Sequence, residues 1–358
     1  MNPCSVCRDE ERPAAEAIGV CSSCLREGRP GAEEPAATAH RAARHEFGLP
    51  ESPPRDADGL ACGLCINQCQ IPAGGAGFCG VRLNAGGRLR GGTAAAAADW
   101  YYDPLPTNCV GAPWCEACAE AGRAGLGSRP RNLAVFYRAC TFDCLFCQNW
   151  HFRDRAFARR LRAPEDLARG VDPTTACICY FGGDPTPTII HALRAARIAR
   201  EAVAGRPLRI CWETNGAMSL PLARRIMRVS LETGGTVKFD LKAWTPAIHR
   251  ALCGADNAWT LRNFAELASM AQAAQGQPAL IASTLMVPGY VDEHEVGGIA
   301  RFVADCDPSI PYALLAFCPQ FFMGDLPTTS RRQADRCLRA AREAGLERVR
   351  LGNQHLLS

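Results

Sequence analysis

Lysine is almost absent from this sequence of 358 residues, in which Lys238 and Lys242 stand against 38 arginines. Basic and acidic side chains nearly cancel to a formal net charge of +4, and no basic run occurs, which gives no case for nucleic-acid binding. Long apolar runs are missing too. The longest run of small apolar residues, Ala94 to Ala98, is much too short to span a bilayer, so we expect no membrane association.

A secretory signal is also lacking, since the first twenty residues are polar and carry a charged stretch from Arg8 to Arg12. We therefore expect a cytoplasmic protein. Its 21 cysteines make up about 6% of the chain, far above an ordinary cytosolic enzyme. Because the cytoplasm keeps thiols reduced, metal ligands explain these cysteines better than disulfides do.

The chain divides into two parts of different character near residue 130. The first part holds eleven of the cysteines, much glycine, proline and alanine, and little periodic hydrophobicity. We expect a cysteine-rich segment and linker over residues 1–58, with a short helix at Ala36–Phe47, and a second cysteine-rich segment over residues 59–130. Such segments bury little apolar surface and are usually stabilised by metal.

From residue 131 to 358, short β-rich runs alternate with longer helical ones, which predicts parallel βαβ units. Six strands indicate an α/β fold with a partial (β/α)6 TIM-like barrel, whose active site lies at the carboxyl ends of the strands. The predicted strands are Leu133–Tyr137, Ala176–Phe181, Leu208–Trp212, Thr236–Leu241, Ala279–Val287 and Tyr312–Phe317. The predicted helices are Pro164–Arg169, Pro187–Ala204, Leu220–Glu232, Leu261–Gln275, Glu293–Ala304 and Ser330–Ala344, followed by a short run at Val349–Leu351.

The loop after the first of these strands contains Cys140, Cys144 and Cys147 at C-x3-C-x2-C spacing. A 4Fe–4S cluster normally takes four cysteines, so three would leave one iron open to a small molecule. Half of a zinc site is the alternative, although zinc pairs are usually C-x2-C with a second pair later in the chain.

This loop resembles the signature of the radical S-adenosylmethionine (radical SAM) superfamily, C-x3-C-x-aromatic-C, with Phe146 as the aromatic residue. The resemblance implies a 4Fe–4S cluster whose fourth iron binds S-adenosyl-L-methionine (SAM). It further implies an oxidoreductase that takes one electron from a donor such as flavodoxin or ferredoxin. The cleaved SAM yields a 5′-deoxyadenosyl radical, which abstracts hydrogen from a substrate.

Polar or glycine-rich residues follow the later strands, as a barrel active site requires. Gly182, Gly183, Asp184 and Pro185 resemble the Gly-Gly-Glu-Pro motif that holds the SAM amino group, with Asp184 one methylene shorter. The segment of Glu213 and Asn215 is similar to one in the pyruvate formate-lyase activating enzymes, and its residues suit ribose hydroxyls.

The next two strands extend this resemblance to the activating enzymes. Asp240 and Lys242 match an Asp-Leu-Lys segment that implies SAM contact, and Pro288 lies in a segment that implies a place near the adenine. An internal acid–base pair is the structural alternative for Asp240 and Lys242. The scarcity of lysine favours a specific role for Lys242, and less strongly for Lys238, because lysine is a compact point charge where arginine is bulky.

The remaining cysteines of the first part fall into three sets. Four cysteines paired as two C-x2-C motifs suit a structural zinc ion: Cys4, Cys7, Cys21 and Cys24. A second quartet fits zinc or an auxiliary iron–sulfur cluster about equally: Cys62, Cys65, Cys69 and Cys79. A trio lacks an evident fourth ligand: Cys109, Cys115 and Cys118. We expect the cysteines within apolar strands, Cys177, Cys179 and Cys211, to be small core residues.

Three functions are consistent with these residues. The first is a radical SAM enzyme that activates a glycyl-radical partner protein. The second acts on a small molecule or peptide with the help of auxiliary iron–sulfur clusters. The third is a non-catalytic iron–sulfur or zinc interaction protein, which the intact cysteine triad and the strand-end residues disfavour.

Overall fold

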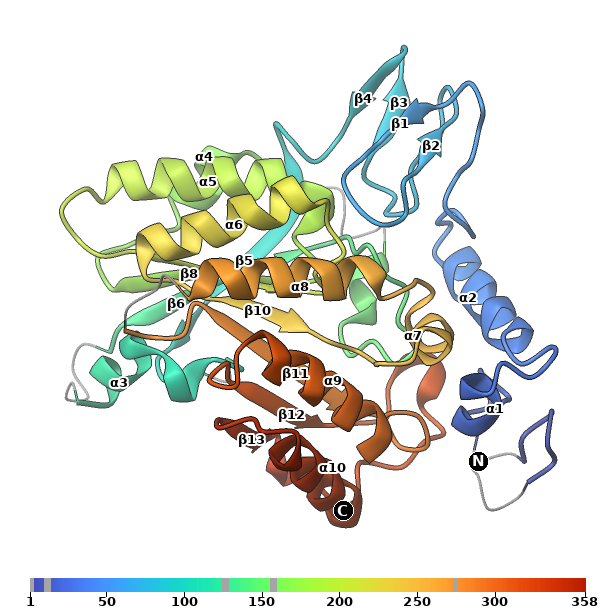
Figure 1. The fold of residues 1–358 in the computed structure, drawn as a ribbon. Helices are drawn as coiled ribbons and strands as arrows, with labels where there is room; N and C mark the ends of the chain where they lie inside the picture. Colours follow the sequence, from blue (N-terminus) through green and yellow to red (C-terminus); the bar gives the residue numbers. More distant parts are fainter. Residues whose placement is uncertain (1–2, 10–13, 108, 124–128, 155–159, 273–275) are drawn as a thin grey trace.

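The computed structural model describes residues 3–9, 14–107, 109–123, 129–154, 160–272 and 276–358 (Figure 1). Its main feature is a nine-stranded sheet in the spatial order β13-β12-β11-β10-β9-β8-β6-β5-β7. Seven neighbouring strands run parallel. They are β6 (Arg131–Tyr137), β8 (Thr175–Gly182), β9 (Arg209–Thr214), β10 (Val237–Asp240), β11 (Leu280–Met286), β12 (Tyr312–Ala316) and β13 (Val349–Gly352). The predicted partial barrel is confirmed, with one parallel strand more than predicted.

Helices follow these strands and pack on the same side of the sheet, as Figure 1 shows. Helix α5 illustrates the packing: Ala192, Ala195, Ala196 and Ala199 form a fully buried stripe at helical spacing, and their small side chains permit a close approach. Among the described helices none has the length and apolar character needed to cross a membrane. The helices are α4 (Pro164–Ala168), α5 (Ile189–Ala202), α6 (Leu220–Thr233), α7 (Pro246–Cys253), α8 (Ala258–Ala271), α9 (Glu293–Cys306) and α10 (Arg331–Glu343).

Two elements differ from the prediction. Helix α7 was not predicted, and the end of the expected helix at Gln275 lies outside the described residues. Strand β5 (Ala96–Pro104) pairs antiparallel with β6 and with the short β7 (Leu161–Arg162), so it belongs to the barrel sheet. The predicted boundary at residue 130 therefore falls inside this sheet. Alanine is a poor strand former, which is why the alanine-rich start of β5 gave little signal.

Apart from β5, the described residues before β6 form small elements beside the barrel. Figure 1 shows α1 and α2 beside α7, which follows the carboxyl end of β10, and the two hairpins at the top of the view, whereas α3 lies at the opposite edge, where the parallel strands begin. These elements are α1 (Ser22–Arg26), α2 (Glu34–Glu46), β1 (Leu60–Ala61), β2 (Gln70–Ile71), β3 (Leu83–Ala85), β4 (Arg88–Arg90) and α3 (Glu116–Arg123). Short 3-10 helices occur at Ala112–Trp114, Trp150–Arg153, Thr186–Thr188, Phe321–Met323 and Gln354–Leu356.

The N-terminal segment is fixed to the barrel by buried polar contacts. The hydroxyl of Tyr290, which is fully buried, accepts from the backbone N–H of Ala15 at 2.9 Å and donates to the carbonyl of Val20 at 3.0 Å. Arg26 bonds to Glu295 at 3.0 Å and to Asp292, the N-cap of α9, at 2.6 Å. These contacts join α1 to the loop that follows β11.

Candidate active site

The three cysteines of the loop after β6 line one cavity of about 230 Å³. The other walls come from strand ends: Gly183 after β8, Asn215 after β9, and Asp240 at the end of β10. The sequence placed these residues at separate strand ends, and the parallel sheet brings them to one cavity. Further lining residues named by the prediction are Phe146, Glu213 and Lys242.

Cys144 of the triad is buried, Cys140 and Cys147 are partly buried, and hydrogen-bond donors and cations lie around the three thiols. Burial raises the pKa of Cys140 well above its usual range and that of Cys147 to about 11. A metal ion must therefore displace their protons. Cys140 Sγ accepts from the backbone N–H of Phe142 at 3.4 Å and lies 3.8 Å from Asn215 Nδ2. Three thiols around one cavity, with donors to sulfur, fit the predicted 4Fe–4S cluster.

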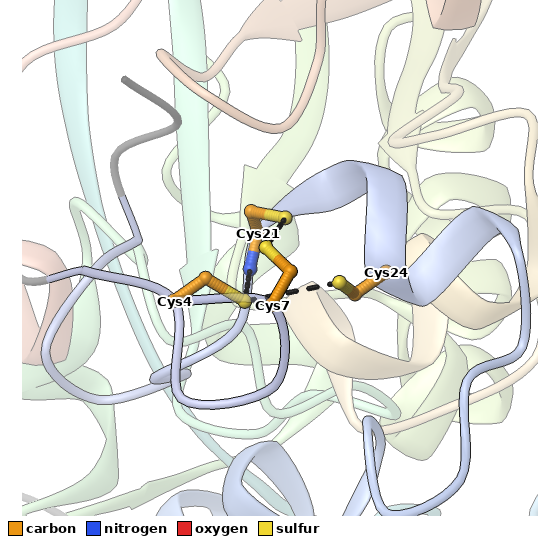
Figure 2. Close-up of side chains that lie close together, drawn as sticks. All are labelled: Cys4, Cys7, Cys21 and Cys24. Carbon is orange, nitrogen blue, oxygen red and sulfur yellow. Dashed lines mark hydrogen bonds between the residues drawn. The ribbon is translucent and has the colours of Figure 1, made fainter. Parts of the chain in front are cut away.

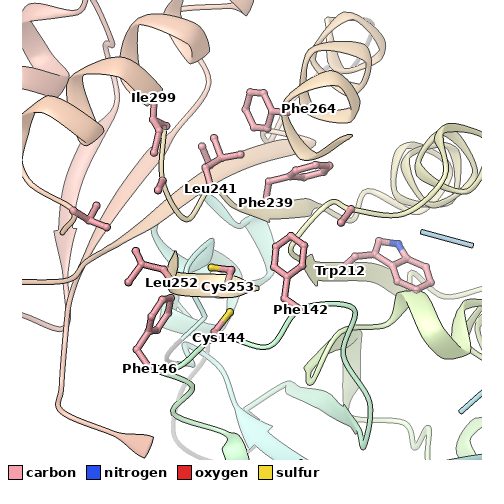
Figure 3. Packing of buried hydrophobic residues seen from close by; sticks show 14 of the residues in the cluster. Phe142, Cys144, Phe146, Trp212, Phe239, Leu241, Leu252, Cys253, Phe264 and Ile299 are labelled. Atoms are coloured by element: carbon pink, nitrogen blue, oxygen red, sulfur yellow. The ribbon is translucent and has the colours of Figure 1, made fainter. Parts of the chain in front are cut away.

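A fourth thiol lies beside this triad. The Cys144 and Cys253 side chains point toward each other (Figure 3), and the hydrogen bond of the Cys144 thiol to Cys253, together with burial, raises the pKa of Cys144. Cys253 ends α7, the helix that the prediction missed, and its carbonyl accepts from Asp143 N at 2.9 Å. Sequence spacing gave no sign of this neighbour, because more than one hundred residues separate the two cysteines.

Asp143, inside the cysteine loop, is the centre of a buried ionic cluster that sequence reasoning missed. His40 Nδ1 lies 3.1 Å from one carboxylate oxygen, and Arg44 and Arg153 lie 3.5 and 3.2 Å from the other. Although burial opposes the charged form, these three partners lower the pKa of Asp143. Helix α2 thus supports the loop that holds the triad.

Arg153 also faces the cavity. Its side chain lines the cavity wall, and its Nη1 is buried without a hydrogen-bond partner among the described residues. The guanidinium lies 4.6 Å from the centre of the Phe321 ring, which fixes its orientation. An unpaired buried guanidinium N–H at a cavity suits an anionic ligand group.

Glycine is required at position 183 by two separate features. Its φ of +60° lies in the left-handed region, and an added Cβ would lie 2.3 Å from Tyr137 O and 2.4 Å from Ala139 O. The neighbouring Gly182 has no room either, because a Cβ there would lie 1.8 Å from the Phe136 ring. The paired glycines therefore let β8 turn directly beneath the cysteine loop.

Asp184 and Pro185 do not line the cavity. The Asp184 carboxylate is buried and accepts from Thr186 N and Thr214 Oγ1 at 2.8 Å and from Asn215 N at 2.9 Å. Its acceptor sites are directed at the protein rather than at the cavity. Through these hydrogen bonds Asp184 joins the loops after β8 and β9.

The pair on β10 lies in the cavity wall. Lys242 bonds directly to Asp240 and lies 5.6 Å from the centre of the Phe146 ring. Burial opposes the ammonium, but Asp240 and Cys144 raise the pKa of Lys242 above its usual range. Pro288 is not among the lining residues, and its neighbour Tyr290 contacts the N-terminal segment instead.

The two cysteine quartets differ in geometry. All four sulfurs of Cys4, Cys7, Cys21 and Cys24 lie within 4.8 Å of one another, with Cys4–Cys24 at 3.9 Å and Cys7–Cys21 at 3.8 Å (Figure 2). A tetrahedral zinc ion with Zn–S bonds of about 2.3 Å separates its sulfurs by about 3.8 Å. The second quartet surrounds a separate small pocket: Cys62, Cys65, Cys69 and Cys79.

The trio of Cys109, Cys115 and Cys118 lies at the other edge of the barrel. Cys115 and Cys118 flank the start of α3, and Cys109 Sγ accepts from Lys238 Nζ at 3.0 Å. The trio is thus separate from both quartets. Lys238 is buried and also pairs with Glu213 at 2.7 Å.

Known proteins provide an independent comparison. The family model described as the Radical SAM superfamily matches residues 134–303, and no curated protein matches the chain. SuiB from Streptococcus suis bound to S-adenosylmethionine has a similar fold, with a TM-score of 0.50 and 12% identity over 67% of this chain. The match spans only 55% of SuiB.

Two further solved structures are similar over part of the chain. A radical SAM methyltransferase from Sphaerobacter thermophilus has a TM-score of 0.47 and 16% identity, covering 64% of this chain and 67% of its own. A domain of pyruvate-formate lyase-activating enzyme from Bacteroides vulgatus has a TM-score of 0.37 and 17% identity, covering 49% and 98%. The family match and the cysteine loop that it includes lead to one conclusion: this chain carries a radical SAM domain, which covers residues 134–303.

Proposed function

We propose that the protein cleaves SAM reductively and uses the product radical to abstract hydrogen from a substrate. The observation that carries this proposal is the cavity in which Cys140, Cys144 and Cys147 meet the residues that follow β8, β9 and β10. When bound, a 4Fe–4S cluster supplies the electron that breaks the sulfur–C5′ bond of SAM, giving methionine and a 5′-deoxyadenosyl radical.

The protein residues bind and orient SAM in this proposal. The left-handed turn at Gly183 exposes backbone to the cavity, where it can accept from the SAM amino group. Nη1 of Arg153, which has no hydrogen-bond partner among the described residues, donates to the SAM carboxylate. Asn215, Glu213 and Asp240 supply acceptors for the ribose hydroxyls, while Lys242 holds Asp240 in place.

The apolar part of the wall protects the radical. Phe142, Phe146 and Leu315 give the cavity wall an apolar part. Exclusion of water prevents loss of the radical to side reactions. A one-electron donor such as flavodoxin or ferredoxin supplies the reducing equivalent.

The substrate belongs to one of two classes, a glycyl-radical partner protein or a small molecule or peptide. Anaerobic incubation with SAM and deuterated candidates separates them, because label moves into 5′-deoxyadenosine only from the true substrate. Deuterium from a backbone glycine of a partner protein supports the first class, and deuterium from a small molecule or peptide supports the second.

We also propose that the first quartet binds structural zinc. The sulfur separations of 3.8 and 3.9 Å match a mononuclear tetrahedral site. A 4Fe–4S cluster would spread its cysteines over four different irons and hold them further apart. The second quartet, around its own small pocket, takes zinc or an auxiliary iron–sulfur cluster.

The SAM proposal is tested by Cys144→Ala, assayed with SAM and dithionite under anaerobic conditions. We expect 5′-deoxyadenosine and methionine from the wild type and neither from this variant. Cys306→Ala is the matched control, since Cys306 ends α9 and does not line the cavity, and it should retain wild-type yield. Formation of 5′-deoxyadenosine by Cys144→Ala would refute the role of the triad.

A further inference from the structure

Three cysteines on neighbouring strands face one another inside the barrel. Cys177 and Cys179 are two residues apart on β8 and so share a face, and Cys211 on β9 is the direct register partner of Cys179. All three are buried and in mutual contact, with relative exposures of 7%, 5% and 9%. From the sequence we expected these cysteines to be small core residues, but three thiols in mutual contact are unusual in apolar strands.

A fourth cysteine reaches the same place from the segment before α3. Lys238 Nζ donates to Cys109 Sγ at 3.0 Å and to Cys179 Sγ at 3.2 Å, so one ammonium joins this segment to β8. Gly111 lies against β10 and β11, because a Cβ there would lie 3.1 Å from Ile281 and 3.5 Å from the Lys238 side chain. The turn after Cys109 therefore enters the barrel.

The electrostatics of this group favour a negatively charged occupant. Lys238 is 3% exposed and has one carboxylate partner, Glu213, at 2.7 Å. Thiolates that bind iron carry net negative charge, and an N–H donor to their sulfur stabilises that charge.

Lysine also suits this position better than arginine. The compact ammonium contacts two sulfurs and a carboxylate at once, which a planar guanidinium could not do in the same space. This contact explains why one of only two lysines in the chain stands here.

We propose that Cys109, Cys177, Cys179 and Cys211 bind an iron–sulfur cluster at the floor of the active-site cavity. Val110, Glu213 and Lys238 line the same cavity as the triad, so this cluster would face the substrate from the opposite end. A single zinc ion fits less well, because among the described residues only the Cys4 quartet has all its sulfurs within 4.8 Å. A cluster distributes its cysteines over several irons and accepts wider spacing.

The test removes the triad first, so that its iron does not interfere. In a background of Cys140→Ala, Cys144→Ala and Cys147→Ala, the full-length chain is purified anaerobically with and without Cys179→Ala/Cys211→Ala. We expect the added pair to remove about two to four iron atoms per chain and as many acid-labile sulfides. Cys306→Ala/Cys337→Ala is the matched control and should change neither number. The proposal is overturned if the iron and sulfide contents are the same with and without Cys179→Ala/Cys211→Ala. It is also overturned if the pair removes zinc instead of iron and no sulfide is found.

Loss of iron in Cys179→Ala/Cys211→Ala could also follow from misfolding. Lys238→Met keeps all four thiols and therefore tests the site with its proposed ligands intact. The signal of the proposed cluster is the iron–sulfur signal that Cys179→Ala/Cys211→Ala removes. Because loss of a positive charge beside a cluster disfavours its reduced form, Lys238→Met should shift the midpoint potential of this signal to a more negative value. An unchanged potential in Lys238→Met contradicts the proposed site. Because these measurements use the triad-free background, failure here leaves SAM cleavage by the wild type unaffected.

Discussion

His40 Nδ1 lies 3.1 Å from the carboxylate of Asp143, while its Nε2 faces the backbone carbonyl oxygens of Arg250 and Ala251 at 3.2 and 3.1 Å. These contacts of the His40 ring tie α2, α7 and the cysteine loop together. The N-terminal region contributes directly to the shape of the active-site loop.

Asp143→Asn should destabilise the protein by about 3 kcal/mol, because it leaves His40, Arg44 and Arg153 without their shared buried counter-charge. Chemical denaturation measures this loss. Glu201→Gln is the control, since its pair with Arg197 is exposed, and should cost less than about 0.5 kcal/mol. Similar values for the two variants would show that the cluster has no such role.

Gly183→Ala should cost about 3 kcal/mol or more and weaken SAM binding by roughly tenfold or more, because left-handed strain and a clash with Tyr137 O and Ala139 O add together. Gly234→Ala isolates the strain: its φ is +65° and an added Cβ meets nothing within 4 Å. That variant should lose only about 1 to 2 kcal/mol and bind SAM normally. Calorimetric titration and denaturation measure both effects, and equal behaviour of the variants would contradict the role of the turn.

Tyr290→Phe tests which part of the molecule the loop after β11 contacts. The change leaves Ala15 N–H and the Val20 carbonyl buried and unpaired, which should cost about 1–3 kcal/mol and increase proteolysis near α1. The KM for SAM should stay unchanged. A raised KM would instead support the contact between this loop and the adenine that the resemblance to the activating enzymes implies. Tyr102→Phe is the control, because the Tyr102 hydroxyl donates to the Gly170 carbonyl at the exposed surface.

Cys24→Ala should lower the zinc content by about one ion per chain relative to the wild type and lower the melting temperature, because the site holds α1 in place. Cys337→Ala removes an equally buried thiol from α10 and should keep its zinc. Metal analysis of purified protein compares the two. A zinc content in Cys24→Ala equal to that of the wild type would rule out the first quartet as a zinc site.

The parallel barrel could be predicted because hydrophobic runs and strand-end residues repeat along the chain. Strands β6 and β8 to β12 appear within two residues of their predicted bounds. The cavity followed from the same logic, since parallel strands bring their carboxyl ends together. Local spacing also identified the Cys4 quartet, whose sulfurs do meet.

Contacts between distant segments could not be predicted in this way. The pairs His40–Asp143 and Cys144–Cys253 each join residues more than one hundred positions apart, and Lys238 meets Cys109 across 129 positions. No local period or spacing encodes such pairs, because the fold decides them. Asp184 shows the opposite case: the motif was visible, but its carboxylate is used inside the protein.

The electron paramagnetic resonance spectrum of the dithionite-reduced full-length protein, recorded with and without SAM, tests the central claim most directly. If Cys140, Cys144 and Cys147 hold a cluster with an iron open to SAM, the spectrum of the wild type should change when SAM is added. Cys306→Ala should show the same change, and Cys144→Ala should show none. A wild-type spectrum that SAM leaves unchanged would contradict the account.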